Sequence, residues 1–201
     1  MKVPQIPTTE LIDAYILSYD NRSAGETKCA LDELAHVFPK NNRLQQVMLK
    51  VTAVDGLYST GIRFISDGLY AVARHIINLD IDERLSACLP DVVNEIARTG
   101  LGKDVYSFAS KYCSIHAPKA YPILDWYVAK VLWGYVKQAH FVDFKSETRF
   151  FEAIYTDYCQ YKMVIEVFQT TYALEEYDFD DLDKFLWLYG NELYATPSTK
   201  T

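Results

Sequence analysis

Apolar side chains recur three and four positions apart along almost the whole chain, which is the pattern of amphipathic helices. The segments that carry this pattern are 11–19, 31–38, 44–51, 67–77, 90–97, 105–116, 125–135, 150–172 and 178–194. No stretch of useful length alternates between apolar and polar residues as a half-buried strand does. We therefore predict an all-α protein of roughly ten helices.

Several helix ends are marked by residues that favour them. Asp67 and Asp125 each precede an apolar helical pattern, as N-cap residues do. Pro90 fits the first turn of a helix, and Gly100 suits a left-handed cap at the end of that helix. The chain shows no internal repeat and no linker, so we predict one unit over residues 1–201.

Composition indicates a large core that needs no metal or disulfide. Half of the 201 residues are hydrophobic, and 14% are aromatic. The four cysteines, at positions 29, 88, 113 and 159, are too far apart for a zinc or iron–sulfur motif, so we expect no cofactor. No apolar run reaches the roughly 20 residues that cross a bilayer. The first residues also lack the pattern of a signal peptide, so we expect a cytoplasmic protein.

Charge is unevenly distributed along the chain, whose formal net charge is −7. Residues 101–149 are net basic, and residues 1–100 and 150–201 are net acidic. Net acidity argues against strong non-specific nucleic-acid binding, which depends on Lys and Arg neutralising phosphates, but it leaves room for a local basic face.

Three segments could carry chemistry, and each also has an ordinary structural interpretation. In Thr99–Lys103, two glycines could let backbone N–H groups bind a phosphate, or they could simply end a helix. In Tyr121–Val128, Asp125 could be a partly buried general base, or only an N-cap. In Asp55–Gly61, small polar residues and Tyr58 could approach a ligand, or could form a turn.

The order of these segments resembles the helix-hairpin-helix superfamily of DNA base-excision glycosylases, over roughly residues 40–135. The nearest motif is Pro122-Ile123-Leu124-Asp125 with Val128, which is similar to the segment around the essential aspartate of the adenine-mismatch branch. Segments 107–113 and 183–187 also resemble a divergent, uncharacterised bacterial branch. The resemblance implies a glycosylase-like fold. Such a fold can consist of two lobes, and the hairpin and the aspartate pocket would then lie within about residues 90–140.

The resemblance also implies site residues. Asp125 would assist hydrolysis of the bond between base and sugar, and Ser107 occupies the position of the lysine found in lyase-active members, so a monofunctional enzyme is expected. The residues expected to contact DNA are Gly100, Gly102, Lys103, Lys111, Tyr58, Ser59, Thr60 and Trp126. For each aromatic side chain in this set, a place in the core is the alternative.

The chain departs from the family pattern in ways that keep other functions open. Gln46 is the nearest counterpart of the glutamate that acts as general acid, and the optional iron–sulfur loop is missing. A catalytically inactive interaction protein of the same fold is the main alternative, with the acidic residues of 175–183 binding a basic partner or starting a helix. A nucleotide enzyme that no longer reads duplex DNA is a third interpretation.

Overall fold

A computed structural model describes residues 3–195, and within that range the protein is entirely helical. The elements are α1 (Thr9–Asp20), α2 (Ser23–Val37), α3 (Leu44–Tyr58), the 3-10 turn η1 (Ile62–Phe64), α4 (Gly68–Leu79), α5 (Asp82–Ser86), α6 (Asp91–Ala97), α7 (Tyr106–Ser114), α8 (Trp126–Ala139), α9 (Glu147–Ile154), α10 (Tyr158–Thr171) and α11 (Phe179–Tyr194). The predicted all-α class and its approximate number of helices are confirmed.

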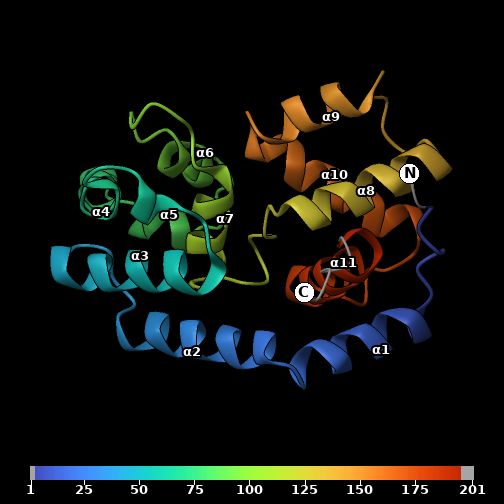
Figure 1. Cartoon of the computed structure of the whole chain (residues 1–201), viewed down its shortest axis with the longest axis horizontal. Helices are drawn as coiled ribbons and strands as arrows, with labels where there is room; N and C mark the ends of the chain where they lie inside the picture. The colour runs from blue at the N-terminus through green and yellow to red at the C-terminus, as the bar shows by residue number, and fades with distance from the viewer. Residues whose placement is uncertain (1–2, 196–201) are drawn as a thin grey trace, which may run out of the picture.

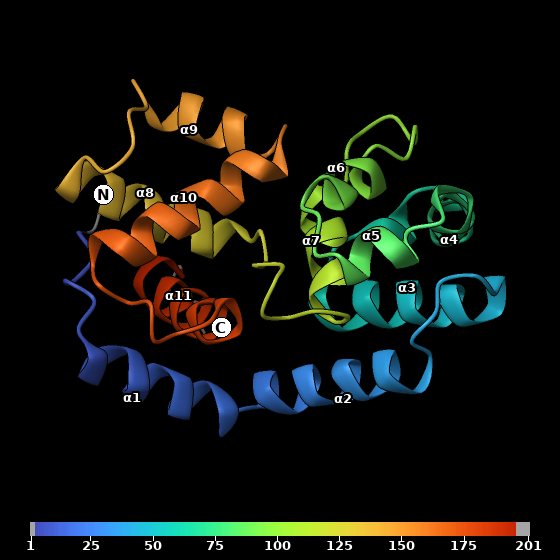
Figure 2. The same cartoon turned by 180° about the vertical axis from the view of Figure 1, so that it is seen from behind.

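The helices form two groups that are bridged by the first two helices (Figure 1). One group contains α3 to α7, and the other contains α8 to α11. Helix α1 packs along α11, and α2 packs along α3, so together they run across both groups. Seen from behind, the segment between α7 and α8 crosses from one group to the other (Figure 2).

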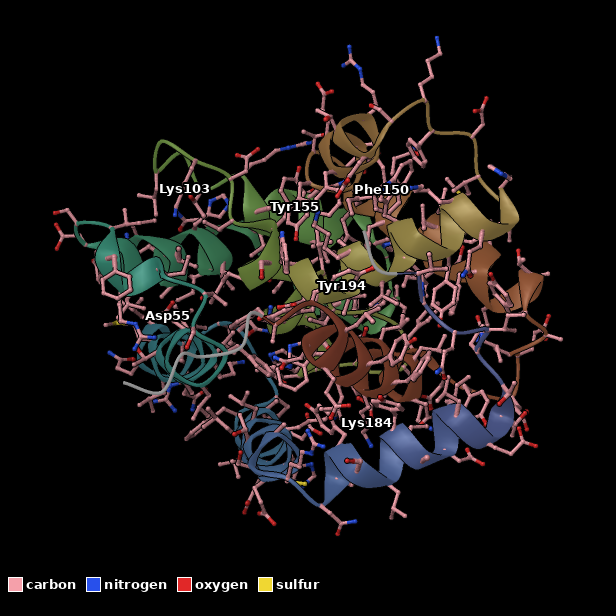
Figure 3. All side chains as sticks on the ribbon, turned by 45° about the vertical axis from the view of Figure 1, so that its right-hand side comes forward. Asp55, Lys103, Phe150, Tyr155, Lys184 and Tyr194 are labelled. Carbon is pink, nitrogen blue, oxygen red and sulfur yellow. The ribbon has the colours of Figure 1, made fainter. Side chains whose placement is uncertain are left out.

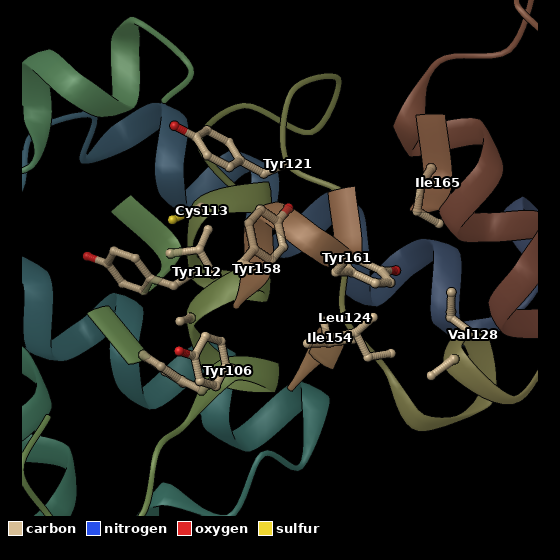
Figure 4. Close-up of a cluster of buried hydrophobic side chains, with 14 of the residues drawn as sticks. Tyr106, Tyr112, Cys113, Tyr121, Leu124, Val128, Ile154, Tyr158, Tyr161 and Ile165 are labelled. Atoms are coloured by element: carbon tan, nitrogen blue, oxygen red, sulfur yellow. The ribbon is translucent and has the colours of Figure 1, made fainter. Parts of the chain in front are cut away.

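A core rich in buried tyrosines joins α7 and α10 to the crossing segment (Figure 4). Tyr158 and Tyr161 lie next to each other with ring centroids 5.8 Å apart, and both side chains are fully buried. The Tyr158 hydroxyl donates to the Pro122 carbonyl at 2.7 Å, and the Tyr161 hydroxyl donates to the Ile123 carbonyl at 2.6 Å. Buried hydroxyls with carbonyl partners avoid a desolvation penalty, so this core also fixes the crossing segment.

Some of the helix ends that the sequence predicts are found in the structure, and others differ. Asp125 is the N-cap of α8, as predicted, and its side chain accepts from the Tyr127 N–H. Asp67 precedes α4 but lies in the left-handed region and makes no side-chain cap bond. The reason is that Gly68 packs against η1, where an added Cβ would lie 2.4 Å from the Ile62 carbonyl oxygen. Asp67 thus occupies the predicted N-cap position, but the packing of Gly68, and not a side-chain hydrogen bond, holds the start of α4.

Two further predictions at helix ends need correction. Helix α6 ends at Ala97, so Gly100 does not terminate it directly. Gly100 lies three residues further on, with a φ of 74°. Pro90 precedes the first turn of α6 as its N-cap residue. The short helix α5 and the turn η1 were not predicted, because segments of three to five residues are too short to show a helical period.

Candidate active site

A cavity of about 410 Å³ lies where the two groups of helices meet. Its walls come from the α1–α2 junction, the end of α3, α7, the start of α8, and α11. Aromatic side chains and charged side chains both line it: Tyr19, Tyr58, Tyr127 and Trp187, together with Lys28, Lys111, Lys184, Asp125, Asp180 and Asp183. A few polar groups on a largely preformed concave surface are typical of a small-molecule site.

Asp125 has two separate roles in this cavity. Its Oδ1 accepts a hydrogen bond from the Tyr127 N–H at 2.9 Å, which caps α8. Its Oδ2 lies 3.1 Å from Nζ of Lys111. The Asp125 side chain is 19% exposed, because it borders the cavity. The cap interpretation and the pocket interpretation of Asp125 are therefore compatible.

Lys111 is the partner of Asp125 and is almost completely buried, with 5% of its side chain exposed. Its Nζ also donates to the Ser107 hydroxyl at 2.9 Å, one helical turn earlier on α7. The same ammonium lies 5.8 Å from the centre of the Tyr58 ring, which is within reach of a cation–π contact. These contacts orient the amine and the carboxylate toward each other.

Side chains of three helices form hydrogen bonds with the backbone just before Asp125. Besides the two tyrosine hydroxyls of α10, Ser110 Oγ of α7 accepts from the Leu124 N–H at 3.0 Å. Asp183 Oδ2 of α11 accepts from the Ile123 N–H at 2.7 Å. Because its backbone groups are bonded to buried partners, the segment presents Asp125 in a fixed position, as a preorganised site requires.

Asp183 is a second carboxyl in the cavity and differs sharply from Asp125. It is 7% exposed, and burial raises the pKa of its carboxyl well above the usual range; nearby Asp180 adds to this rise. The Ile123 N–H and the ammonium groups of Lys111 and Lys28 act in the opposite direction on this pKa. Among the described residues, no group forms a hydrogen bond with Oδ1 of Asp183.

The loop after α3 is tied to that helix by a buried carboxylate. Asp55, labelled in Figure 3, accepts from the Thr60 hydroxyl and the Ile62 N–H, both at 2.7 Å. It also pairs with the Arg63 guanidinium at 3.1 Å. These hydrogen bonds and the ion pair lower the pKa of Asp55, against the effect of its burial. Thr60 therefore holds the loop in place, and Ser59 is the residue of this loop that lines the cavity.

The structure brings some of the predicted site residues together and leaves others apart. Tyr58, Ser59, Lys111 and Asp125 line the cavity, and Ser107 contacts it through Lys111. Lys111 lies inside, so it does not offer a surface contact to a DNA phosphate. The remaining predicted residues do not line the cavity: Thr60, Gly100, Gly102, Lys103 and Trp126.

The predicted phosphate-binding turn is an exposed loop between α6 and α7. Gly100 and Gly102 both have positive φ, and nothing lies within 4 Å of a Cβ added at either position. These glycines therefore serve the turn geometry. Lys103 lies on this loop, well apart from Lys184 of the cavity (Figure 3). Trp126 is 47% exposed and packs edge-on against Tyr127.

The acidic residues near the C-terminus are largely engaged within the fold. Asp178 and Asp181 form a capping box at the start of α11. Asp180 pairs with Lys28 at 3.0 Å and with Lys184 at 3.7 Å. This arrangement accords with the helix-start interpretation of the segment.

Sequence reasoning missed four cavity residues of note: Tyr19, Lys28, Asp183 and Trp187. Tyr19 and Lys28 lie near the α1–α2 junction, outside the resemblance over residues 40–135. Asp183 and Trp187 lie in segment 183–187 of α11, whose resemblance to a bacterial branch carried no function. Their spacing within each helix carries no sign of a site.

No helix within residues 3–195 is long and apolar enough to span a membrane. In the same range, no group of three or more His, Cys, Asp or Glu side chains is placed to hold a metal ion.

These features define a two-lobed, all-helical protein whose lobes enclose a cavity with a buried aspartate–lysine pair. The chain belongs to the HI_0787 N-terminal domain family, whose model matches residues 11–120. An uncharacterised protein of Haemophilus influenzae is 34% identical over 155 residues, covering 75% of this chain and 69% of that relative. No solved structure matches the chain. The matched range contains Lys111, whereas Asp125 and Asp183 lie beyond it.

Proposed function

We propose that this protein hydrolyses the N-glycosidic bond of a nucleotide in DNA, with Asp125 as the residue that stabilises the developing sugar cation and activates water. The observation that carries the proposal is the Asp125–Lys111 pair at 3.1 Å inside a cavity of about 410 Å³. Departure of a base leaves positive charge on the sugar, and a fixed carboxylate in a site that excludes bulk water stabilises that charge strongly.

The walls of the cavity suit a flipped nucleotide. Tyr58, Tyr19 and Trp187 are aromatic lining residues on which a base could stack. Ser59 and Lys184 are lining residues that could make polar contacts. An enzyme that acts on a base in a duplex must first move the nucleotide out of the stack, at a cost of a few kcal/mol, and fill the space that it leaves. The resemblance to base-excision glycosylases supports the same chemistry.

Phe64 is suited to filling that space. It is 84% exposed, which is unusual for a large aromatic side chain, and it ends η1 on the loop that contributes Ser59 to the cavity. The Arg63 guanidinium lies 5.5 Å from the centre of the Phe64 ring and provides a positive charge beside it. The buried carboxylate of Asp55 holds the loop, so this pair projects from a fixed base.

Phe64→Ala is expected to weaken binding to duplex DNA about tenfold, because base–aromatic stacking contributes roughly 1–3 kcal/mol. The measurement is fluorescence anisotropy with an uncleavable duplex at fixed salt. Leu17→Ala is the matched control, since Leu17 is 66% exposed on α1 and does not line the cavity. Equal losses in the two variants would count against a role of Phe64 in DNA binding.

The position of Lys111 favours a second candidate, in which strand cleavage follows base release. Its amine is the group that could attack C1′ and form a Schiff base, after passing a proton to Asp125. The expectation of a monofunctional enzyme rests on Ser107 at the lyase position, and Lys111 reaches the cavity one turn further along α7.

Sodium borohydride trapping separates the two candidates. For a lyase, reduction in the presence of substrate duplex gives a covalent protein–DNA adduct in the wild type and none in Lys111→Gln. Lys103→Gln serves as the control, because Lys103 is exposed and does not line the cavity. A monofunctional enzyme gives no adduct in any of the three proteins, although base release continues in the wild type.

The experiment that tests the proposed function is a base-release assay on duplexes that carry single damaged or mismatched bases. Abasic sites are revealed by hot alkali, and free nucleosides and single strands are assayed in parallel. Release from duplexes, together with affinity that falls steeply with salt, would support the proposal. Release from free nucleosides alone would favour the nucleotide-enzyme interpretation, and no release from any substrate would refute an enzymatic role.

A further inference from the structure

The reaction needs a group that protonates the departing base, and the family position for that group does not supply one here. Gln46 occupies that position, and it neither carries an acidic proton nor lines the cavity. A base that leaves as an anion is a poor leaving group, so a positioned acid typically contributes 10²–10⁴-fold to such a step. If the proposed function holds, another acid is required.

We infer that Asp183 is that acid: a neutral carboxyl group that faces the cavity as a hydrogen-bond donor and passes its proton to the departing base. Its Oδ2 is engaged by the Ile123 N–H at 2.7 Å, and Oδ1 has no partner among the described residues. A buried oxygen without a partner is costly, so a role for it must be sought in the cavity that it borders. The inference rests on the proposed function.

The geometry allows the carboxyl group to reach a ligand. Asp183 lines the same cavity as Asp125, and it is bonded to the backbone two residues before Asp125. The Oδ1 atom is buried at the cavity wall, and the terminal torsion of an aspartate is soft, so rotation about this torsion is the motion that would bring Oδ1 to a ligand. The two carboxyls thus lie in contrasting environments, one beside an ammonium and one in a dry wall, which is the arrangement that assigns base and acid roles.

The groups around Asp183 come from six helices, and they determine its protonation. Those that interact with it electrostatically are Tyr19 of α1, Lys28 of α2, Tyr58 of α3, Lys111 of α7, Tyr158 and Tyr161 of α10, and Asp180 of α11. Burial outweighs the two ammonium groups, and the pKa of Asp183 is raised. Its proton is therefore held at pH values where an ordinary aspartate has lost it.

The step is balanced in protons and electrons. As the bond between C1′ and the base nitrogen breaks, its electron pair stays with the base. The Asp183 proton moves to a ring nitrogen or carbonyl oxygen of the base. The sugar cation faces the Asp125 carboxylate, and water adds to C1′ while its proton moves to Asp125. Exchange with solvent then removes the proton from Asp125 and returns one to Asp183.

Asp183→Asn tests this role, because an asparagine keeps the acceptor for the Ile123 N–H and a donor toward the cavity but has no proton to give. We expect roughly 100-fold slower base release at neutral pH, with binding of an uncleavable duplex changed less than about threefold. In the wild type, release should fall as pH rises through the raised pKa of Asp183, and this decline should be absent from the variant. Asp180→Asn, on the same helix, should keep the decline but move it to lower pH, because Asp180 adds to the rise of the pKa of Asp183.

The outcomes distinguish failure of the inference from failure of the proposed function. Base release by Asp183→Asn within threefold of wild type, or equal losses of release and of binding, would overturn the role of Asp183. A wild type that releases no base would overturn the proposed function. In that case, infrared spectroscopy at neutral pH still decides the protonation of Asp183: a neutral carboxylic acid band that disappears in Asp183→Asn supports a donor in the cavity, and its absence overturns one.

Discussion

Asp125→Asn is expected to lower base release at least about 1,000-fold while leaving the fold intact, because removing the charge that stabilises the sugar cation removes a large electrostatic contribution. Asparagine caps helices as well as aspartate does, so the hydrogen bond from the Tyr127 N–H is retained. The ion pair with Lys111 is lost, which costs some stability because Lys111 is buried. Single-turnover release of the base, with thermal unfolding measured in parallel, tests this expectation.

Asp157→Asn is the matched control for this experiment. Asp157 is the N-cap of α10, and it accepts from the N–H two residues ahead, as Asp125 does for α8. It does not line the cavity. We expect Asp157→Asn to retain wild-type release. Equal activity of the two variants would show that Asp125 acts only as a helix cap, and the enzymatic proposal would then fall.

Lys50→Met is expected to destabilise the protein by about 3 kcal/mol, more than a hundredfold in the unfolding equilibrium, because three acceptors lose the ammonium donor that they share. Lys50 is fully buried, and its Nζ donates to the Phe38 and Lys40 carbonyls at 3.0 and 3.1 Å. It also donates to Asn41 Oδ1 at 2.6 Å. The Lys50 ammonium thus donates hydrogen bonds to three acceptors in the segment that follows the end of α2.

The expected loss in the free energy of unfolding is a net value, because hydrogen bonds of Lys50 stabilise the fold while burial of its charge destabilises it. Burial lowers the pKa of Lys50 to about 8, which reflects the cost of holding an ammonium away from water. Its neighbour His116, whose Nε2 is 3.1 Å from the Lys50 Nζ, has a pKa lowered to about 3 by burial and by Lys50. His116 is therefore neutral at pH 7 and does not add a second charge.

Thermal and urea unfolding of Lys50→Met, with Lys103→Met as the exposed control, measure this effect. A loss of about 3 kcal/mol corresponds to a fall in Tm of roughly 10 °C for a chain of this size. The control should change by less than about 0.5 kcal/mol. A Lys50→Met protein as stable as wild type would mean that the desolvation cost of the ammonium equals the contribution of its hydrogen bonds.

The sequence predicted those features that depend on neighbouring residues. The helical periods of α1, α3, α7 and α11 are local, since a helix face is fixed by spacing within one segment. The first turns of α2 were missed because residues 23–30 are mostly small or polar and show no apolar stripe. The start of α4 after Asp67 was predicted correctly, but the contact of Gly68 with η1 that holds it was not, because that contact comes from packing.

The sequence by itself determined the all-helical class and the place of Asp125 at the start of a helix, because periodicity and capping are properties of short segments. Only the tertiary structure decided which side chains meet. Lys111 reaches Asp125 from 14 residues earlier, and Asp183 joins them from α11, 60 residues beyond Ile123. The packing of α7, α8 and α11 brings these groups together, and the same packing excludes the water that would otherwise ionise Asp183.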